Sequence, residues 1–340
     1  MGLTDFFVQE LAIDLGTANT LIIYKDEVVV EQPSIIAVNR MTGELIAAGH
    51  EAMMMHGKTH DDIKTIRPLK DGVIADFNAA EQMLRSMIGL VNEGKQYFAP
   101  HLRRGICIPS VITEVEKRAV KDSAERAGGK EVKLIHEPMA AAIGIGIDVE
   151  APNGSMIIDI GGGTTEVAVI ALGGIVCDQS IRVAGDEFTS DIEEYMRREH
   201  NILIGERSAE KIKIAVGSAL AELDDPPEDY KVSGRDVVSG IPKEISINYS
   251  EIASALDESI SKIEDAIQRV LEQTPPELSS DIYNTGLYLN GGGALIRGLD
   301  KRIAEKTDLP VHIAEDPLRS VARGTGIALK NMHRFKFLIS

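Results

Sequence analysis

The sequence predicts an α/β protein with two lobes, and three observations lead to this fold class. The chain has 340 residues, more than a single hydrophobic core usually organises. Strand patterns alternate with helix patterns along its length. One hairpin pattern, in which apolar strands flank an Asp and a turn of small residues, occurs at residues 11–24 and again at 156–170. The repetition predicts one hairpin in each lobe, both facing a common ligand.

The composition narrows the class of protein. The 53 acidic residues outnumber the 36 basic ones and give a net charge of -17, which argues against nucleic acid as a partner. Cys107 and Cys177 lie in apolar strand patterns, and we expect reduced cysteines, no secretion signal and a cytoplasmic location. The most apolar long stretch, 156–177, is interrupted by Asp159, Glu166 and glycines, so we expect no membrane-spanning segment.

Each hairpin turn has the residue types of a phosphate-binding loop. The turns consist of Gly16, Thr17, Ala18 and Asn19 after Asp14, and of Gly161, Gly162, Gly163 and Thr164 after Asp159. Tiny side chains allow consecutive backbone N–H groups to face an anion, and hydroxyl groups add donors. A carboxylate beside them suits a hydrated divalent cation. The two hairpins therefore predict a nucleotide held between two lobes.

A third glycine turn follows the apolar strand that ends at Asn290. It contains Gly291, Gly292, Gly293, Ala294 and Leu295. The missing Cβ atoms would let a flat base or an α-phosphate approach the backbone. An ordinary strand-to-helix turn is the alternative. Three such turns, each directly after an apolar strand, favour nucleotide binding.

The middle of the chain continues the alternation of helix and strand. Thr113 and Glu116 form a capping-box pattern that begins a helix, and Gly128 ends that helix. A short strand at 132–136 follows. Glu137 then begins a second helix, which leads toward the centre of the chain.

The second half contains a hinge candidate and two further helices. The glycine pair within 144–146 is the candidate hinge between the lobes. Ser250 is expected to cap the longest amphipathic helix, which Pro275 ends. Residues 223–243, rich in Asp, Pro and Ser, are expected to form the edge or loops of an inserted subdomain, and a last helix is expected over 316–332.

The order and spacing of these motifs resemble the actin, Hsp70 and sugar-kinase superfamily. Its phosphate 1, connect 1, phosphate 2, adenosine and connect 2 motifs are similar to the segments that begin at Asp14, His136, Asp159, Gly291 and Val321. Within that superfamily, residues 66–76 and 181–187 are most similar to the MreB family of rod-shape-determining bacterial actins. Two residues differ from the usual motifs of the family. His136 lies where a Glu is common, and Asn290 lies where a hydroxyl residue is common.

The resemblance implies an actin-like ATPase fold, with two ribonuclease-H-like lobes and small inserted subdomains around a nucleotide cleft. Lobe I would span residues 1–145, with an insertion at about 33–65. Lobe II would span 146–315, with an insertion at about 182–245. Residues 316–340 would form a C-terminal helix that returns to lobe I.

The resemblance also assigns roles in binding and hydrolysing ATP. Asp14 and Asp159 would hold Mg2+, mainly through water, beside the β- and γ-phosphates. Glu137 would position the attacking water with help from Thr164. Turn stabilisation is the alternative role for either Asp. Glu137 could instead serve only to stabilise the N-terminus of its helix.

Further nucleotide contacts are implied on one helix. The resemblance places Glu210 and Lys213 against the ribose and the base, and their three-residue spacing puts them on one helical face. A solvated charged face is the alternative. The segment 52–59 loosely matches a P-loop that ends in Lys58 and Thr59, but three consecutive Met residues favour a packing or self-association surface instead.

The function implied is that of a filament-forming ATPase whose slow hydrolysis is coupled to polymerisation. It would bind itself in protofilaments, arranged in pairs, organise cell-wall synthesis and maintain rod shape. An Hsp70-like or sugar-kinase-like ATPase is the alternative. The first would need a further substrate domain, and the second would need an acceptor pocket with a catalytic base.

The resemblance further implies a peripheral location on the inner face of the cytoplasmic membrane. Phe6 and Phe7 near the N-terminus, and Tyr97 and Phe98 in a polar loop, are the candidate membrane contacts. Packing of these aromatic side chains on the protein is the alternative. Membrane proteins of the MreC, MreD and RodZ type would be partners, and nucleic acid would not.

Overall fold

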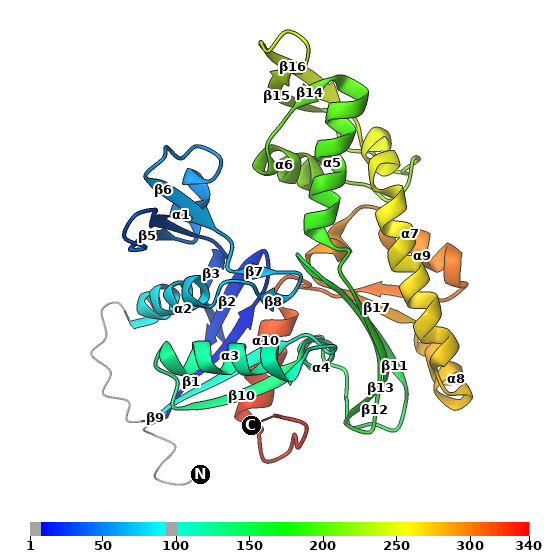
Figure 1. Ribbon diagram of the computed structural model, residues 1–340. Helices are drawn as coiled ribbons and strands as arrows, with labels where there is room; N and C mark the ends of the chain where they lie inside the picture. The colour runs from blue at the N-terminus through cyan, green and yellow to red at the C-terminus, as the bar shows by residue number, and fades with distance from the viewer. Residues whose placement is uncertain (1–7, 93–100, 340) are drawn as a thin grey trace.

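Two five-stranded sheets with the same topology form the centres of the two lobes (Figure 1). The computed structural model describes residues 8–92 and 101–339. The first sheet has the order β10 (Glu131–His136), β9 (His101–Ile108), β1 (Val8–Leu15), β2 (Asn19–Tyr24), β3 (Glu27–Pro33). The second has the order β13 (Gly174–Ile181), β12 (Thr165–Ala171), β11 (Ser155–Ile160), β17 (Leu287–Asn290), β18 (Val311–Ile313). The α/β fold class predicted from the sequence is confirmed.

The register of the two sheets follows one plan. In each sheet the predicted hairpin is antiparallel, as β1 with β2 and as β11 with β12. The first strand of each hairpin, β1 or β11, also pairs in parallel with a strand from later in the chain, β9 or β17. Each Asp therefore lies near the end of a central strand, where buried neighbours surround it on both sides.

Helices cover both sheets and supply the cores. The first lobe carries α2 (Phe77–Asn92), α3 (Glu114–Arg126), α4 (Glu137–Gly144) and α10 (Ser320–Lys330). The second carries α5 (Gly185–His200), α6 (Glu206–Val216), α7 (Tyr249–Gln273), α8 (Pro276–Thr285) and α9 (Leu299–Thr307). The predicted capping box of α3 is present, because the Thr113 side chain accepts from the Glu116 N–H and the Glu116 side chain accepts from the Thr113 N–H.

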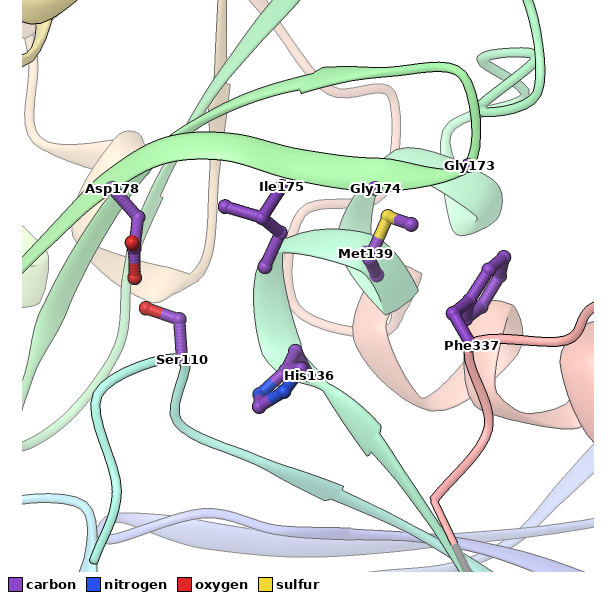
Figure 2. A pocket seen from close by; sticks show the side chains of 8 residues that line it. All are labelled: Ser110, His136, Met139, Gly173, Gly174, Ile175, Asp178 and Phe337. Carbon is purple, nitrogen blue, oxygen red and sulfur yellow. The ribbon is translucent and has the colours of Figure 1, made fainter.

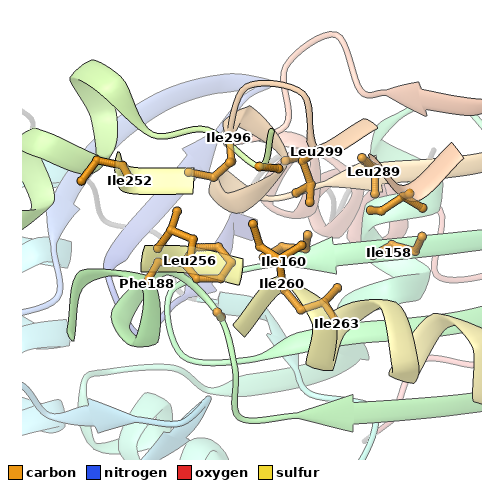
Figure 3. Close-up of a cluster of buried hydrophobic side chains, with 14 of the residues drawn as sticks. Ile158, Ile160, Phe188, Ile252, Leu256, Ile260, Ile263, Leu289, Ile296 and Leu299 are labelled. Carbon is orange, nitrogen blue, oxygen red and sulfur yellow. The ribbon is translucent and has the colours of Figure 1, made fainter. Parts of the chain in front are cut away.

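The longest helix, α7, is amphipathic as its sequence predicts. Its apolar side chains at three- and four-residue spacing are buried in the core against β12, β13 and α5, and Figure 3 shows Ile252, Leu256, Ile260 and Ile263 in this core. Each such side chain contributes on the order of 1.5–3 kcal/mol relative to exposure. The prediction that Ser250 caps this helix is wrong. Asn248 is the cap, since its side chain accepts from the Glu251 N–H at 3.0 Å and Glu251 completes a capping box.

The start of the last helix also differs from the prediction. The helix α10 begins at Ser320, because the preceding residues form a turn in which the N–H groups of Arg319 and Ser320 both donate to the Asp316 carbonyl. The prediction of a helix from Asp316 is therefore wrong by about one turn. This turn matters for the site because it places the Ser320 hydroxyl within hydrogen-bond distance of the Asn290 side chain.

Two small sheets lie on the upper parts of the lobes in Figure 1. The first consists of β5 (Leu45–Ala48), β4 (Ile36–Asn39) and β6 (Ile63–Ile66), with α1 (His50–Met55) beside it. The second consists of β14 (Ile202–Leu203), β15 (Tyr230–Asp236) and β16 (Pro242–Ile247). A two-stranded sheet of β7 (Leu69–Lys70) and β8 (Val73–Ile74) completes the strands of the described residues. The limits of the lobes and insertions given above stay predictions.

The segment that loosely matched a P-loop does not have the shape of one. Residues Ala52 to Met55 lie inside α1, and the N–H groups of Met53 and His56 donate to helical carbonyls. A phosphate-binding loop needs such N–H groups to be free for the ligand. Lys58 instead lines a surface cavity of about 370 Å³ together with residues at the start of α6.

The helices α4 and α10 cross with their backbones in contact. A Cβ added at Gly144 would collide with the Ser320 carbonyl, and one added at Gly324 would collide with the Ala140 carbonyl. These glycines therefore allow an approach that no other residue permits. Both Cys107 and Cys177 are free thiols. Among the described residues, no helix is both long enough and apolar enough to cross a membrane.

Candidate functional site

The two predicted phosphate-binding turns meet face to face. A Cβ added at Gly162 would lie 2.7 Å from the Cβ of Ala18, and one added at Gly163 would lie 2.7 Å from Oγ1 of Thr17. Only glycine fits at these two positions. Although the turns are some 145 residues apart in the sequence (162 minus 17), the fold places them side by side between the lobes.

Different groups hold the two turns in place. In the first hairpin, the Ser34 hydroxyl donates to the Gly16 carbonyl at 2.6 Å and shares a hydrogen bond with Thr20 at 2.8 Å. In the second, the first N–H groups of α5, from Gly185 and Asp186, donate to the carbonyls of Gly161 and Gly162. The first turn is therefore fixed by hydroxyl groups and the second by the start of a helix.

Asp14 lies near the end of β1, beside Cys107 of the neighbouring strand β9. The Cys107 thiol donates to Asp14 Oδ1 at 3.1 Å. Burial raises the pKa of Asp14 to about 6, and the thiol hydrogen bond lowers it only in part. Burial, together with the charges of Asp14 and Glu137, raises the pKa of the Cys107 thiol well above its usual value. The thiol therefore stays protonated and serves as a hydrogen-bond donor.

Asp159 occupies the equivalent place on β11 and is only 6% exposed. Its Oδ1 accepts a hydrogen bond from Asn290 Nδ2 at 2.9 Å. Burial and the nearby charge of Asp14 raise the pKa of Asp159 to about 7, while the Asn290 hydrogen bond opposes this rise. The two aspartates thus share one buried region and repel each other when both are ionised.

The donor set of this region fits a small hard cation. Two carboxylates with raised pKa values would be stabilised in their ionised form by a divalent cation between them. Within residues 8–92 and 101–339, no group of three or more His, Cys, Asp or Glu side chains has the geometry of a metal site. Asp14 and Asp159 would therefore supply only part of the coordination, with water and phosphate oxygens supplying the rest.

Glu137 is the first residue of α4 and faces the same region. Burial raises its pKa well above the usual value, and the charges of Glu166, Asp159 and Asp14 raise it further, in that order. The carboxyls of four acidic residues therefore interact at the base of the two hairpins. Thr164 is buried beside the loop at Gly72. Glu137 thus lies close to the predicted cation ligands, and its pairing with Thr164 stays a prediction.

The sequence reasoning missed Glu166, which is 1% exposed. It lies directly opposite Asp159 in the hairpin, and its Oε2 accepts from the Ser110 N–H at 2.7 Å. Its Oε1 has no hydrogen-bond partner among the described residues. Counting equal steps outward from the glycine turn would have identified this pairing, because antiparallel register places residues 159 and 166 side by side.

Glu210 and Lys213 lie on one face of α6, as their spacing predicts, and form an ion pair at 2.6 Å. The Lys213 ammonium also donates to the Gly185 carbonyl at 2.7 Å and to the Thr189 hydroxyl at 3.1 Å. Because Gly185 also donates to Gly161, Lys213 lies next to the second phosphate turn. Contact of Glu210 and Lys213 with ribose and base stays a prediction.

The third glycine turn packs on the end of β11. Gly291 has a φ of 79°, and a Cβ there or at Gly293 would collide with Ile160. The turn residues Gly292, Gly293, Ala294 and Leu295 form a short 3-10 helix rather than leading directly into an α-helix. This turn therefore lies beside Asp159 and the second phosphate turn, while its contact with adenosine stays a prediction.

His136, the unusual residue before Glu137, faces a different space. It lines a cavity of about 300 Å³, and its Nδ1 lies 3.2 Å from the Pro109 carbonyl. Figure 2 shows the other lining residues, which are Ser110, Met139, Gly173, Gly174, Ile175, Asp178 and Phe337. His136 therefore contributes to a cavity between the two lobes and makes no hydrogen bond to Glu137.

The four predicted membrane contacts are not placed. Phe6, Phe7, Tyr97 and Phe98 lie outside the described residues. Their insertion into lipid stays a prediction.

Two lobes of one topology, with phosphate-type turns that meet over a cluster of carboxylates, define a protein of the actin-like ATPase fold. The family model described as "MreB/Mbl protein" matches residues 8–337. The chain belongs to the MreB/Mbl family.

Individual relatives agree with this family. The cell shape-determining protein Mbl of Bacillus subtilis (strain 168) is 47% identical over 329 residues, which cover 96% of this chain and 98% of that protein. The cell shape-determining protein MreB of Escherichia coli (strain K12) is 47% identical over 334 residues, which cover 96% and 95%. The crystal structure of MreB 5 of Spiroplasma citri bound to AMPPNP has a TM-score of 0.90 and 42% identity, covering 96% of this chain and 97% of that one.

Proposed function

We propose that this protein is a bacterial actin homologue that binds and hydrolyses ATP with Mg2+, forms filaments and determines cell shape. The observation that carries the proposal is the direct contact of the two phosphate-type turns above Asp14, Asp159 and Glu137. A relative of 42% identity is described as bound to AMPPNP, an ATP analogue, which supports nucleotide binding by this chain. Relatives of 47% identity named as cell shape-determining proteins support the cellular role.

The chemistry of the site follows from its residues. The N–H groups and hydroxyls of the two turns would bind the β- and γ-phosphates, with one turn on each side. Bound Mg2+ would neutralise phosphate charge in the leaving group and the transition state. Glu137, whose pKa is raised by burial and then by its acidic neighbours, would orient the attacking water and accept its proton, with help from Thr164.

Hydrolysis would be slow and coupled to assembly. The γ-phosphate would touch both turns, so ATP would favour one arrangement of the lobes over others. ADP lacks this bridge. The contact of α4 with α10 gives the lobes a defined crossing about which they would rearrange. ATP would thereby favour the form that polymerises, and hydrolysis would weaken it.

The filament would lie on the inner face of the cytoplasmic membrane and organise cell-wall synthesis. Phe6, Phe7, Tyr97 and Phe98 would enter the lipid, and membrane proteins of the MreC, MreD and RodZ type would bind the filament. The net charge of -17 opposes adsorption of a single subunit to anionic lipid. A polymer presents many anchors at high effective concentration, so avidity would hold filaments where monomers bind weakly.

Sedimentation tests the proposal. The purified protein is incubated with Mg2+ and ATP, AMPPNP, ADP or no nucleotide, and the pellets are viewed by electron microscopy. We expect ordered polymer with ATP and AMPPNP at a lower critical concentration than with ADP. Equal critical concentrations in AMPPNP and ADP would contradict the coupling. Phosphate transfer from ATP to a sugar without polymer would favour the kinase alternative.

Flotation tests the membrane part separately. Polymers should rise with anionic liposomes, and replacing Phe6, Phe7, Tyr97 and Phe98 with Ser should abolish flotation while nucleotide binding persists. If the quadruple variant floats as well as the parent protein, the anchor lies elsewhere or in a partner.

A further inference from the structure

A buried chain of hydrogen bonds connects Asp159 to the helix crossing between the lobes. Asn290 lies next to Asp159 in the parallel register of β17 and β11, and its Nδ2 donates to Asp159 Oδ1 at 2.9 Å. The Ser320 hydroxyl, in the first turn of α10, donates to Asn290 Oδ1. Asn290 is 0% exposed and Ser320 is 1% exposed, so water does not compete with either bond.

The chemistry of the amide explains why both bonds form together. An ionised carboxylate accepts hydrogen bonds only, so it requires the NH2 end of the Asn290 amide. The carbonyl end then faces Ser320, whose hydroxyl supplies the donor. A hydroxyl side chain at position 290 has a single oxygen for both partners and a shorter reach. The Asn290 amide can therefore bond the Asp159 carboxylate and the Ser320 hydroxyl at the same time.

The chain continues beyond Ser320. The Ser320 carbonyl lies where a Cβ on Gly144 would collide with it, and Gly144 ends the helix α4 that begins at Glu137. Asp159 is therefore joined through two side chains to the place where α4 and α10 touch. Among the described residues, no protein group donates to the second carboxylate oxygen of Asp159, which leaves that oxygen for a water of a bound cation.

We propose that Asn290 is a positioning residue that fixes the Asp159 carboxylate for a hydrated divalent cation and, through Ser320, ties that carboxylate to the first turn of α10. The proposal rests on the proposed function, because a cation at Asp159 is part of it. Asn290 itself touches neither nucleotide nor cation. Its effect is on the orientation of a carboxylate that does.

The experiment titrates Mg2+ against the binding of a fluorescent AMPPNP analogue. Asn290→Leu removes both hydrogen bonds at similar volume, Asn290→Thr replaces the amide with a single hydroxyl, and Ser320→Ala removes only the bond on the α10 side. Asn284→Leu, at an exposed amide on α8, is the matched control. Each variant is also measured with excess EDTA, where no cation is present, and its melting temperature is recorded.

We expect Asn290→Leu to need about tenfold more Mg2+ for half-maximal binding, the scale seen when a group that orients a metal ligand is lost. Asn290→Thr and Ser320→Ala should need about threefold more, and Asn284→Leu should match the parent. Affinity in EDTA should change by less than about twofold in every variant, because the positioning role concerns the cation alone.

Two results would overturn the proposal. An unchanged Mg2+ requirement in Asn290→Leu, or in Asn290→Thr and Ser320→Ala if the Leu variant does not fold, would show that Asp159 needs no such support. An equal loss of affinity with Mg2+ and with EDTA would show a general structural role. If the parent protein itself bound no nucleotide, the proposed function would fail, and this inference would fail with it.

Discussion

The two hairpins have the same backbone and different electrostatics. Each places an Asp at the end of a central strand and a turn of small residues after it. In the first hairpin, the residue opposite Asp14 is Leu21, whereas in the second the residue opposite Asp159 is Glu166. A single position in the partner strand therefore makes the second hairpin the more acidic one.

The support behind each Asp differs in the same way. Asp14 accepts from a thiol, which is a weak donor, while Asp159 accepts from an amide that is itself held by Ser320. The pKa values run against this contrast, at about 6 for Asp14 and about 7 for Asp159, because burial and the charges of Asp14 and Glu166 outweigh the Asn290 hydrogen bond that lowers the pKa of Asp159. Repetition of a fold motif thus does not repeat its chemistry, because the neighbours across the sheet decide it. We therefore expect the first hairpin to act mainly in binding and the second to affect hydrolysis as well, because Asp159 and Glu166 influence the pKa of Glu137 more strongly than Asp14 does.

The largest expected effect concerns Glu137, whose pKa is raised by burial and then by carboxylates of both hairpins. Glu137→Gln keeps the shape and removes the base, so ATP hydrolysis should slow by a factor of roughly 100 to 10,000. Affinity for Mg-ATP should stay nearly intact. Single-turnover release of phosphate measures the rate, and Glu277→Gln on the exposed face of α8 is the control. An unchanged rate would show that Glu137 serves only to stabilise the N-terminus of α4.

The second prediction concerns stability against pH without nucleotide or Mg2+. The native pKa values of Asp14 and Asp159 lie above the usual Asp value of 3.8. Between about pH 4 and pH 7 the native state therefore binds more protons than the unfolded state, and the free energy of unfolding falls as pH rises. A shift of one carboxyl from 3.8 to about 7 corresponds to about 4 kcal/mol, an upper value for Asp159.

Urea unfolding at several pH values measures this slope. Asp159→Asn should flatten it and should make the nucleotide-free protein more stable at pH 7.5, and Asp14→Asn should do the same to a smaller extent. Saturating Mg2+ and AMPPNP should also reduce the slope, since a cation stabilises the ionised carboxylates. A free energy of unfolding that rises from pH 5 to pH 7.5 in the parent protein would contradict the assignment.

The sequence predicted the turns because their cause is local. Gly16, Gly162 and Gly163 are required by close approaches of the backbone, and a run of small residues after an apolar strand already indicates such an approach. The capping box at Thr113 and Glu116 is local in the same sense. These features could be read without knowing the neighbours in space.

The predictions that were wrong or missing depend on partners that are distant in the sequence or that compete with one another. Ser and Asn are both common N-cap residues, so the sequence alone allows Ser250 or Asn248. In the structure Asn248 is the cap, because the Glu251 side chain accepts a hydrogen bond from the Asn248 N–H and so completes a capping box. Cys107 and Asn290 became parts of the site through strands β9 and β17, which pair with the hairpins from far along the chain. Their roles depend on sheet register, which the local pattern does not specify.

The third prediction compares the two aspartates directly. Both Asp14→Asn and Asp159→Asn should weaken Mg-ATP binding by about 10- to 100-fold, the scale for groups that hold a metal through its outer shell. Only Asp159→Asn should also lower the rate of hydrolysis at saturating Mg-ATP by more than about fivefold, since Asp159 influences Glu137 more strongly than Asp14 does. Calorimetric titration and phosphate release separate the two effects. Equal effects of the two variants on both measurements would show that the two hairpins do not differ in their roles.

The smallest expected effect tests the weak donor behind Asp14. Cys107→Ala removes the thiol that donates to Asp14 Oδ1 at 3.1 Å, and loss of one modest hydrogen bond corresponds to about 0.5–1 kcal/mol, or roughly twofold to fivefold in affinity. Cys107→Ser keeps a donor of similar size and should recover most of the Mg-ATP affinity. Cys177→Ala, at the other free thiol, should have no effect on binding. If Cys107→Ala and Cys107→Ser weakened binding equally, the cavity left by sulfur would be the cause. The contrast between the two hairpins would then depend on Glu166 and Asn290 alone.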